Sequence, residues 1–116
     1  MARTPTEASG FLPLHPLEFR ILMSLTAGPS YGTRIVQEIE EREAGRMTLY
    51  PANLYRRIRD LVGRELLAEC AAPEGADPRR TYVRLTRLGS VVASEEARRL
   101  QDLLHDALAH DLLPGG

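Results

Sequence analysis

The sequence contains no lysine and no tryptophan, and Cys70 is its only cysteine. A single cysteine excludes a disulfide within the chain and a zinc site built from several cysteines. No stretch approaches the roughly 18 apolar residues that a membrane span requires. Residues 1–13 also lack the apolar core of a secretion signal. We therefore expect a cytoplasmic protein that does not associate with membranes.

The chain also lacks any pattern that indicates catalysis. It has no set of nucleophile, base and acid, and Gly28-Pro29 is a turn rather than a phosphate-binding loop. His105 and His110 are separated by a spacing that does not place both imidazoles on one helix face. We predict no enzyme activity, no cofactor and no metal site within one chain. A metal site completed across two chains stays open, as does oxidation sensing by Cys70.

What the chain does contain is arginine, distributed unevenly. Its 116 residues are enough for one domain, with 43% hydrophobic and 27% charged residues. Residues 46–87 carry nine arginines and five acidic residues, whereas both flanking segments are net negative. The local charge distribution sets the field that a polyanion meets, so a net charge of −1 does not argue against DNA binding.

The hydrophobic pattern predicts three short helices, a β-hairpin and one long helix. Pro16 and Pro51 suit first helical positions, and Ser30 and Thr86 suit the N-caps of the second and last helices. We expect residues 1–13 to be a flexible tail, 14–86 a DNA-binding domain and 87–113 a dimerisation helix. The expected elements are helices at 16–27, 31–43 and 51–64, strands at 66–72 and 81–85, and the last helix after Thr86.

A basic helix followed directly by a β-hairpin is typical of a winged helix-turn-helix domain. Residues 51–64 carry a core stripe on one helix face, formed by Leu54, Ile58, Leu61 and Val62. The loop between the strands is rich in Pro, Gly and Asp, which are turn residues. We predict a mainly helical fold with a small β-hairpin, namely a winged helix-turn-helix domain with a long C-terminal dimerisation helix.

Residues that point away from the expected core are the candidate DNA contacts. Asn can read adenine, and Arg can read guanine or hold phosphate. Hairpin arginines suit phosphate or the minor groove, and hydroxyls at a helix N-terminus suit phosphate. Plainer interpretations are a solvated helix face, hairpin charge for solubility, partial burial of Tyr55 and an N-cap role for Ser30. The candidates are Ser30, Tyr31, Asn53, Tyr55, Arg56, Arg59, Arg79 and Arg80.

The last helix carries a wider apolar stripe than a lone surface helix needs. At about 1.5 Å per residue, its roughly 26 residues would span nearly 40 Å, which exceeds the needs of a domain of this size. Such a helix buries its apolar face against a partner chain, so we predict a homodimer. The leucines expected at this interface are Leu100, Leu103, Leu104 and Leu108.

Four segments resemble the PadR family of transcriptional regulators, in its short form with one C-terminal helix. Residues 14–18 (LHPLE) resemble the family's first helix entry, and residues 28–32 (GPSYG) followed by Ile35 resemble its first turn. Residues 54–67 resemble its third helix and first strand through Leu54-Tyr55, Ile58, Leu61, Leu66 and Leu67, and residues 79–89 (RRTYVRLTRLG) its second strand. The chain departs from the family pattern at Val62 and Glu65, where Glu and Gly are usual. It also lacks the tryptophan with which some members stack flat ligands.

The resemblance implies a dimeric repressor whose third helices enter successive major grooves of a pseudo-palindromic operator in double-stranded DNA. It also implies a pocket for an unidentified small-molecule effector near the dimer interface, lined by the last helix and the first, which adds Leu17 and Ile21 to the expected interface. One alternative is a winged-helix module that binds protein instead of DNA, which would show a hydrophobic exposed face on the third helix. An enzyme is a more distant alternative.

Overall fold

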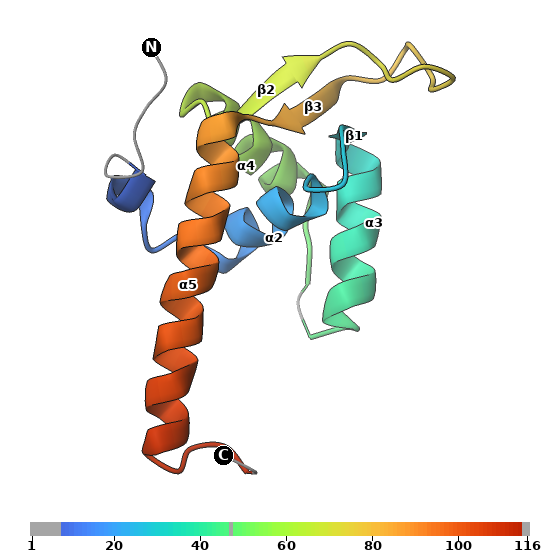
Figure 1. The fold of residues 1–116 in the computed structure, drawn as a ribbon. Coiled ribbons are helices and arrows are strands. Elements are labelled where there is room, and N and C mark those ends of the chain that lie inside the picture. The colour runs from blue at the N-terminus through green and yellow to red at the C-terminus, as the bar shows by residue number, and fades with distance from the viewer. Residues whose placement is uncertain (1–7, 47, 115–116) are drawn as a thin grey trace.

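The structure is a computed structural model that describes residues 8–46 and 48–114. The helices α2, α3 and α4 form a bundle, a small sheet lies on one side of it, and α5 runs along another side and extends beyond it (Figure 1). The elements in chain order are η1 (a 3-10 helix, Ser9–Phe11), α2 (Pro16–Ser24), β1 (Ser30–Tyr31), α3 (Gly32–Glu43), α4 (Pro51–Gly63), β2 (Leu67–Cys70), β3 (Tyr82–Leu85) and α5 (Arg87–Ala109).

Local sequence explains where α2 and α4 begin. Pro16 and Pro51 occupy the first turns of these helices, as expected. At α2, His15 and Glu18 form a capping box in which the Glu18 carboxylate accepts a hydrogen bond of 3.1 Å from the His15 amide. The His15 ring in turn accepts one of 3.0 Å from the amide of Leu17. The entry to α2 is therefore held by side chains as well as by the helix itself.

The start of α5 is fixed against the turn that joins α4 to β2. Thr86 is the N-cap, as predicted, and its Oγ1 accepts a hydrogen bond of 2.9 Å from the Gly89 amide. The Thr86 amide donates to the carbonyl of Leu66 at 3.1 Å. A Cβ added at Gly89 would lie 2.0 Å from that carbonyl oxygen, so only glycine allows α5 to approach this closely.

The sheet has three antiparallel strands in the order β1-β3-β2. The predicted hairpin is confirmed, with strands shorter than expected. Tyr82 of β3 pairs with Tyr31 of β1 on one side and with Cys70 of β2 on the other. The two-residue strand β1 was not predicted. It pairs with β3 and so attaches the wing, which is the hairpin of β2, β3 and the loop between them, to the start of α3.

The core is built where α2, α3 and α4 meet the hairpin and the first half of α5. The expected stripe of α4 is buried at Leu54, Ile58 and Leu61, while Val62 is half-buried. Among the described helices, none combines the length and the apolar content that crossing a membrane demands. The largest fully buried apolar side chains are Ile21, Leu22, Ile35, Ile39, Leu54, Leu61, Leu66, Leu67 and Val92.

Three expectations about element boundaries were wrong. Residues 8–13 are not a loose tail, because Ala8 is fully buried and Phe11 packs against the core. Residues 1–7 lie outside the described residues.

Helix α2 ends at Ser24 and not near residue 27, because the following turns tighten into i→i−3 hydrogen bonds. Helix α5 ends at Ala109 and not at 113, because Asp111 adopts a left-handed conformation with φ of 58°.

Candidate nucleic-acid interface

The outer face of α4 is polar and basic. Asn53, Arg56 and Arg59 are exposed on the side opposite the buried stripe, as the sequence predicted. Within the described part of the chain, these three side chains have no hydrogen-bond or ion-pair partner. Their donors are therefore available to a ligand, and they lie on a rigid helix that supports groove contacts.

The wing is joined to the bundle by an aromatic and cationic stack. The guanidinium carbon of Arg80 lies 4.2 Å from the ring centre of Tyr31, a cation–π distance. The rings of Tyr31 and Tyr82 meet edge to face, with centroids 5.5 Å apart and an interplanar angle of 76°. Because Tyr31 is also the N-cap of α3, the stack fixes the position of Arg80 relative to the bundle.

A groove of about 410 Å³ lies between the start of α3, the outer side of α4 and the wing. Arg59 and Arg80 line it from α4 and the wing, and Glu69 is the one acidic residue among those lining it. Tyr55, 39% exposed, packs so closely on α3 that a Cβ added at Gly32 would lie 2.1 Å from its ring. Tyr55 is therefore partly buried: one edge of its ring contacts Gly32, and the rest of the ring faces the groove.

The tip of the wing contains an acidic partner that the sequence analysis overlooked. Asp77 accepts hydrogen bonds from the amide of Arg79 at 2.9 Å and from its Nε at 3.1 Å. The hydrogen bonds from Arg79 hold the pKa of Asp77 below its usual value, with Arg80 adding to the effect. Arg79 nevertheless keeps 88% of its side chain exposed, so it points into solvent at the wing tip.

Ser30 was wrongly expected to cap α3. Tyr31 is the N-cap residue, and the structure shows no side-chain capping hydrogen bond at this helix among the residues it describes. Ser30 is 6% exposed because it pairs with Val83 in the sheet, and its hydroxyl has no hydrogen-bond partner among the described residues. The hydroxyl faces the protein interior, so Ser30 does not belong to the exposed surface that a phosphate would meet. Tyr31 is half-buried and remains beside the groove.

Not every arginine of the basic segment is available to a ligand. Arg57 of α4 and Arg64, the C-cap residue of α4, form ion pairs with Glu18 of α2. Arg64 also pairs with Asp60 at 2.8 Å. The net positive charge of residues 46–87 is therefore partly neutralised within the molecule. Arg56 and Arg59 of α4 face outward, as do Arg84 and Arg87 beyond it. Arg79 and Arg80 are exposed at the wing, where both lie beside Asp77.

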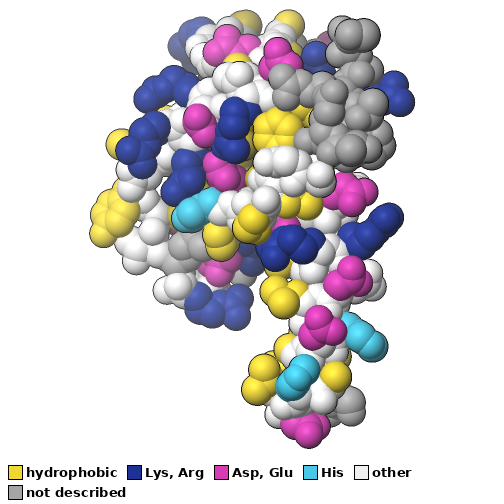
Figure 2. All heavy atoms as spheres, turned by 90° about the vertical axis from the view of Figure 1, so that its left-hand side faces the viewer, with side chains coloured by type: hydrophobic (Ala, Val, Ile, Leu, Met, Phe, Trp, Pro, Cys, Tyr) yellow, Lys and Arg dark blue, Asp and Glu magenta, His cyan; other side chains and the backbone are white. Residues whose placement is uncertain are grey.

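The residues expected at a dimer interface divide into two groups. Leu17 and Ile21 of α2 were wrongly assigned, because they are 8% and 0% exposed in the core of one chain. The other group consists of four leucines in the second half of α5. Figure 2 shows hydrophobic side chains beside acidic ones and histidines on the part of α5 that projects from the bundle. The exposed fractions are 37% for Leu100, 55% for Leu103 and 49% for Leu104, and Leu108 is half-buried.

A second hollow, of about 360 Å³, lies where α2 meets α5 beside these leucines. Phe19, Met23 and Leu100 give it an apolar lining, and Glu96 and Arg99 of α5 reach it from one side. The described residues contain no cluster of three or more His, Cys, Asp or Glu side chains that could hold a metal ion. His105 and His110 are both exposed, and Cys70 is half-buried in β2.

The three-helix bundle, the wing and the exposed basic face of α4 define this chain as a winged-helix DNA-binding protein. Residues 21–95 match the model of the transcriptional regulator PadR-like family. The chain belongs to this family, whose members are transcriptional regulators that bind DNA, typically as dimers. No curated protein sequence matches the chain significantly.

Solved structures agree with this fold. A PadR family transcription regulator from Clostridium difficile is 18% identical, covers 83% of this chain and 98% of its own, and has a TM-score of 0.73. A PadR-like transcription factor from Bacteroides fragilis is 26% identical, with 81% and 87% covered and a TM-score of 0.66. A MarR mutant from Escherichia coli is 19% identical, with 95% and 74% covered and a TM-score of 0.71.

Proposed function

We propose that this regulator is a homodimeric, ligand-responsive repressor that binds a pseudo-palindromic operator. The observation that carries the proposal is the face of α4, where Asn53, Arg56 and Arg59 are exposed without partners among the described residues, beside a groove that leads to the wing. Asn and Arg are the side chains that make bidentate contacts with adenine and guanine. In the proposal, these residues read base edges in the major groove, with Tyr55 beside them.

The wing has a different role in the proposal. Arg79 and Arg80 contact phosphates or the minor groove, and Tyr31 supports Arg80 through the stack described above. Phosphate contacts provide affinity and register but carry no sequence information. This division of roles gives α4 the specificity and the wing the salt-dependent part of the affinity.

The proposed dimer forms through α5. Residues 14–86 would act as the DNA-binding domain and residues 87–113 as the dimerisation segment. The exposed Leu100, Leu103 and Leu104 form an apolar surface on the second half of α5. Burying large aliphatic side chains stabilises an association by about 1.5–3 kcal/mol each. Two α4 helices related by a two-fold axis would then meet half-sites about one helical turn of DNA apart.

The hollow between α2 and α5 is the proposed effector pocket. It lies next to the leucines of the proposed dimer interface, so a small molecule bound there would contact the helix that sets the separation of the two DNA-binding domains. Because the chain has no tryptophan, a flat ligand would have to be held by Phe19 and aliphatic side chains. Binding to chromosomal DNA implies that the protein acts in the cytoplasm.

The alternative is a winged-helix module that binds another protein. Such a module would present an apolar face on α4, whereas Asn53, Arg56, Arg59 and Asp60 make most of its exposed face polar or charged. The exposed apolar side chains there are Tyr55 and, in the first turn, Pro51 and Ala52. Selection of duplexes from a random library, followed by sequencing, tests the two proposals. We expect a motif with two inverted half-sites, and light scattering should give about twice the monomer mass of 12.9 kDa. Failure to enrich any duplex above background would overturn the DNA-reading proposal.

A further inference from the structure

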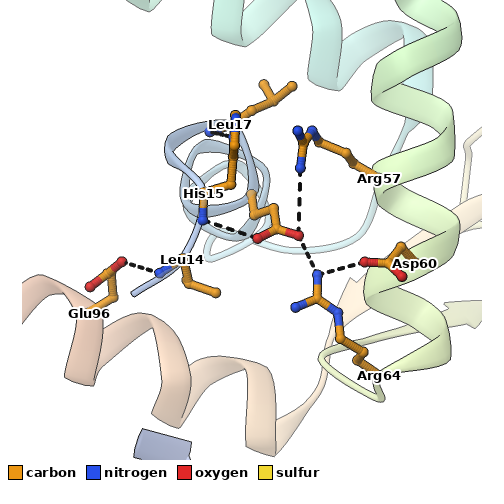
Figure 3. Close-up of polar contacts among 8 residues, drawn as sticks. Leu14, His15, Leu17, Arg57, Asp60, Arg64 and Glu96 are labelled. Carbon is orange, nitrogen blue, oxygen red and sulfur yellow. Dashed lines mark hydrogen bonds and ion pairs between the residues drawn. The ribbon is translucent and has the colours of Figure 1, made fainter. Parts of the chain in front are cut away.

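Two buried carboxylates hold the chain segment between Leu14 and Glu18 from both ends (Figure 3). At one end, Glu96 of α5 is 1% exposed, and its Oε2 accepts a hydrogen bond of 2.7 Å from the Leu14 amide. Its other oxygen binds Arg99 of the same helix. The connection ties the middle of α5 to the residue that leads into α2.

At the other end of the segment, Glu18 ties α2 to α4. Glu18 is 8% exposed, and one of its oxygens accepts the hydrogen bond from the His15 amide that begins α2. Its second oxygen contacts Arg64 and lies 3.8 Å from Arg57. Arg57 lies in α4 and Arg64 is the C-cap residue of that helix, and neither lines the groove. In Figure 3 the two arginines reach toward α2 from α4, while Glu96 reaches the start of the segment from α5.

The two contacts form one continuous polar connection from α5 to α4. Only the capping turn of α2 separates the Leu14 amide from the Glu18 carboxylate, and that turn is itself closed by the His15 amide. A buried charge is costly unless its partners keep their geometry. A shift of α5 against α2 or of α2 against α4 would therefore strain one of these contacts. The other contact would share that strain, because only the hydrogen-bonded capping turn lies between them.

We infer that Glu18 and Glu96 are positioning residues that together set the orientation of α4 relative to α5. The inference rests on the proposed function, since it concerns how the helix that reads DNA is held against the helix that pairs two chains. It assigns to two carboxylates, neither of which faces the groove, control over the affinity for a specific operator. It also gives the hollow beside Glu96 and Arg99 a structural route to α4.

The test compares Glu18→Gln and Glu96→Gln with Glu41→Gln. Glutamine keeps an acceptor for the backbone amide but removes the charge that holds the arginines. Glu41 is exposed on α3 and has no ion-pair partner among the described residues, so the control makes the same change in net charge. Removing a negative charge strengthens nonspecific DNA binding by electrostatics. A decrease of affinity in the first two variants would therefore run against their charge change.

We expect Glu18→Gln and Glu96→Gln each to weaken binding to a selected operator by about tenfold relative to Glu41→Gln, while binding to random duplexes is not weakened. The double variant should bind no more weakly than the weaker single variant, because both changes break one connection. Equal operator affinity in all three variants would overturn the inference. If the two substitutions acted independently, the fold decrease in affinity of the double variant would equal the product of the two single fold decreases. That outcome would show two separate structural contacts and would overturn the connection between them.

Hydrogen exchange of the amides of residues 51–64 separates this inference from the proposed function. Exchange in α4 should be faster in Glu18→Gln and in Glu96→Gln than in Glu41→Gln, without any DNA present. If the wild-type chain binds no duplex, the operator proposal fails, and the exchange result alone decides whether the carboxylates hold α4. If Glu18→Gln does not fold, the exchange of α4 in Glu96→Gln is compared with that in Glu41→Gln in the same way. Unchanged exchange in α4 would contradict the positioning role.

Discussion

Arg80 lies over the ring of Tyr31 at 4.2 Å, and this contact connects the wing to the first residue before α3. Cation–π contacts contribute about 0.5–1 kcal/mol at exposed sites. This energy is small, but the contact fixes the position of the Arg80 guanidinium relative to the bundle. A phosphate contact from Arg80 would thus be made by a side chain that is already oriented before DNA binds.

The first prediction concerns the wing. Replacing Arg79 and Arg80 with Ala should weaken binding to specific and random duplexes about equally. The slope of log affinity against log salt becomes less steep by roughly 0.9 for every phosphate that the protein no longer binds. The double variant should therefore lose the contribution of up to about two phosphates per subunit to this slope. Titrations at several salt concentrations measure this. Arg42→Ala is the control, because Arg42 is an exposed arginine near the end of α3 and lies outside both the groove and α5. If sequence preference disappeared and the slope stayed constant, the wing would be reading bases.

The second prediction concerns α4. Arg56→Ala or Arg59→Ala should cost on the order of 1–3 kcal/mol of operator binding if the residue contacts a base, and should relax preference at one position of each half-site. The reason is that neither guanidinium has a partner within the described chain, so its donors are free for DNA. Competition binding against single-base operator variants measures the effect. Unaltered affinity and preference in both variants would remove α4 from the role of reader.

The sequence predicted well the features that depend on short-range pattern. The stripe of Leu54, Ile58 and Leu61 repeats with the helical period over a whole helix, so its inward face and the opposite basic face follow from spacing alone. The N-cap at Thr86 depends on a hydroxyl and an amide close by in the chain. The hairpin follows from two apolar runs around a turn-rich loop.

Features that depend on distant partners were missed. The strand β1 has two residues, and it forms only because β3 passes beside it. Ser30 looks like a helix cap in the sequence, and its burial follows from that pairing. The contact of Glu18 with Arg64 joins residues 46 positions apart, which no local spacing indicates. Leu17 and Ile21 show a further limit, because an apolar helix face does not reveal whether the same chain or a partner covers it.

The third prediction tests the close approach of α5 to the turn between α4 and β2. Gly89→Ala should destabilise the fold by about 1–3 kcal/mol, because the added methyl group would meet the backbone carbonyl of Leu66, which cannot rotate away. Gly63→Ala is the matched control, since a Cβ there meets nothing within 4 Å and the residue is in a helix. That control should stabilise the chain by up to about 1 kcal/mol. Urea unfolding measures both, and equal midpoints would show that α5 can move aside.

The fourth prediction concerns pH. Burial raises the pKa of Glu96, but the hydrogen bonds from Arg99 and from the Leu14 amide outweigh it, and the pKa lies below its usual value. A carboxylate with a lowered pKa stabilises the folded state above the pKa of the unfolded chain, about 4.3 for glutamate, and that contribution is lost as the pH falls toward the folded value. The difference in unfolding free energy between wild type and Glu96→Gln should therefore be largest near pH 7 and shrink below about pH 4.3. A difference that stayed constant down to pH 3 would contradict this assignment.

The last prediction concerns the dimer. Leu100 and Leu104 are exposed one helical turn apart in the second half of α5. Replacing both with Glu should yield monomers at micromolar concentration, because two carboxylates would be buried at the interface without partners. Gln37→Glu, at an exposed position on α3, is the control for adding a negative charge. Light scattering gives the mass and circular dichroism confirms that the helices persist. A wild-type mass of 12.9 kDa would show that α5 does not pair the chains, and a variant that stayed dimeric would place the interface elsewhere.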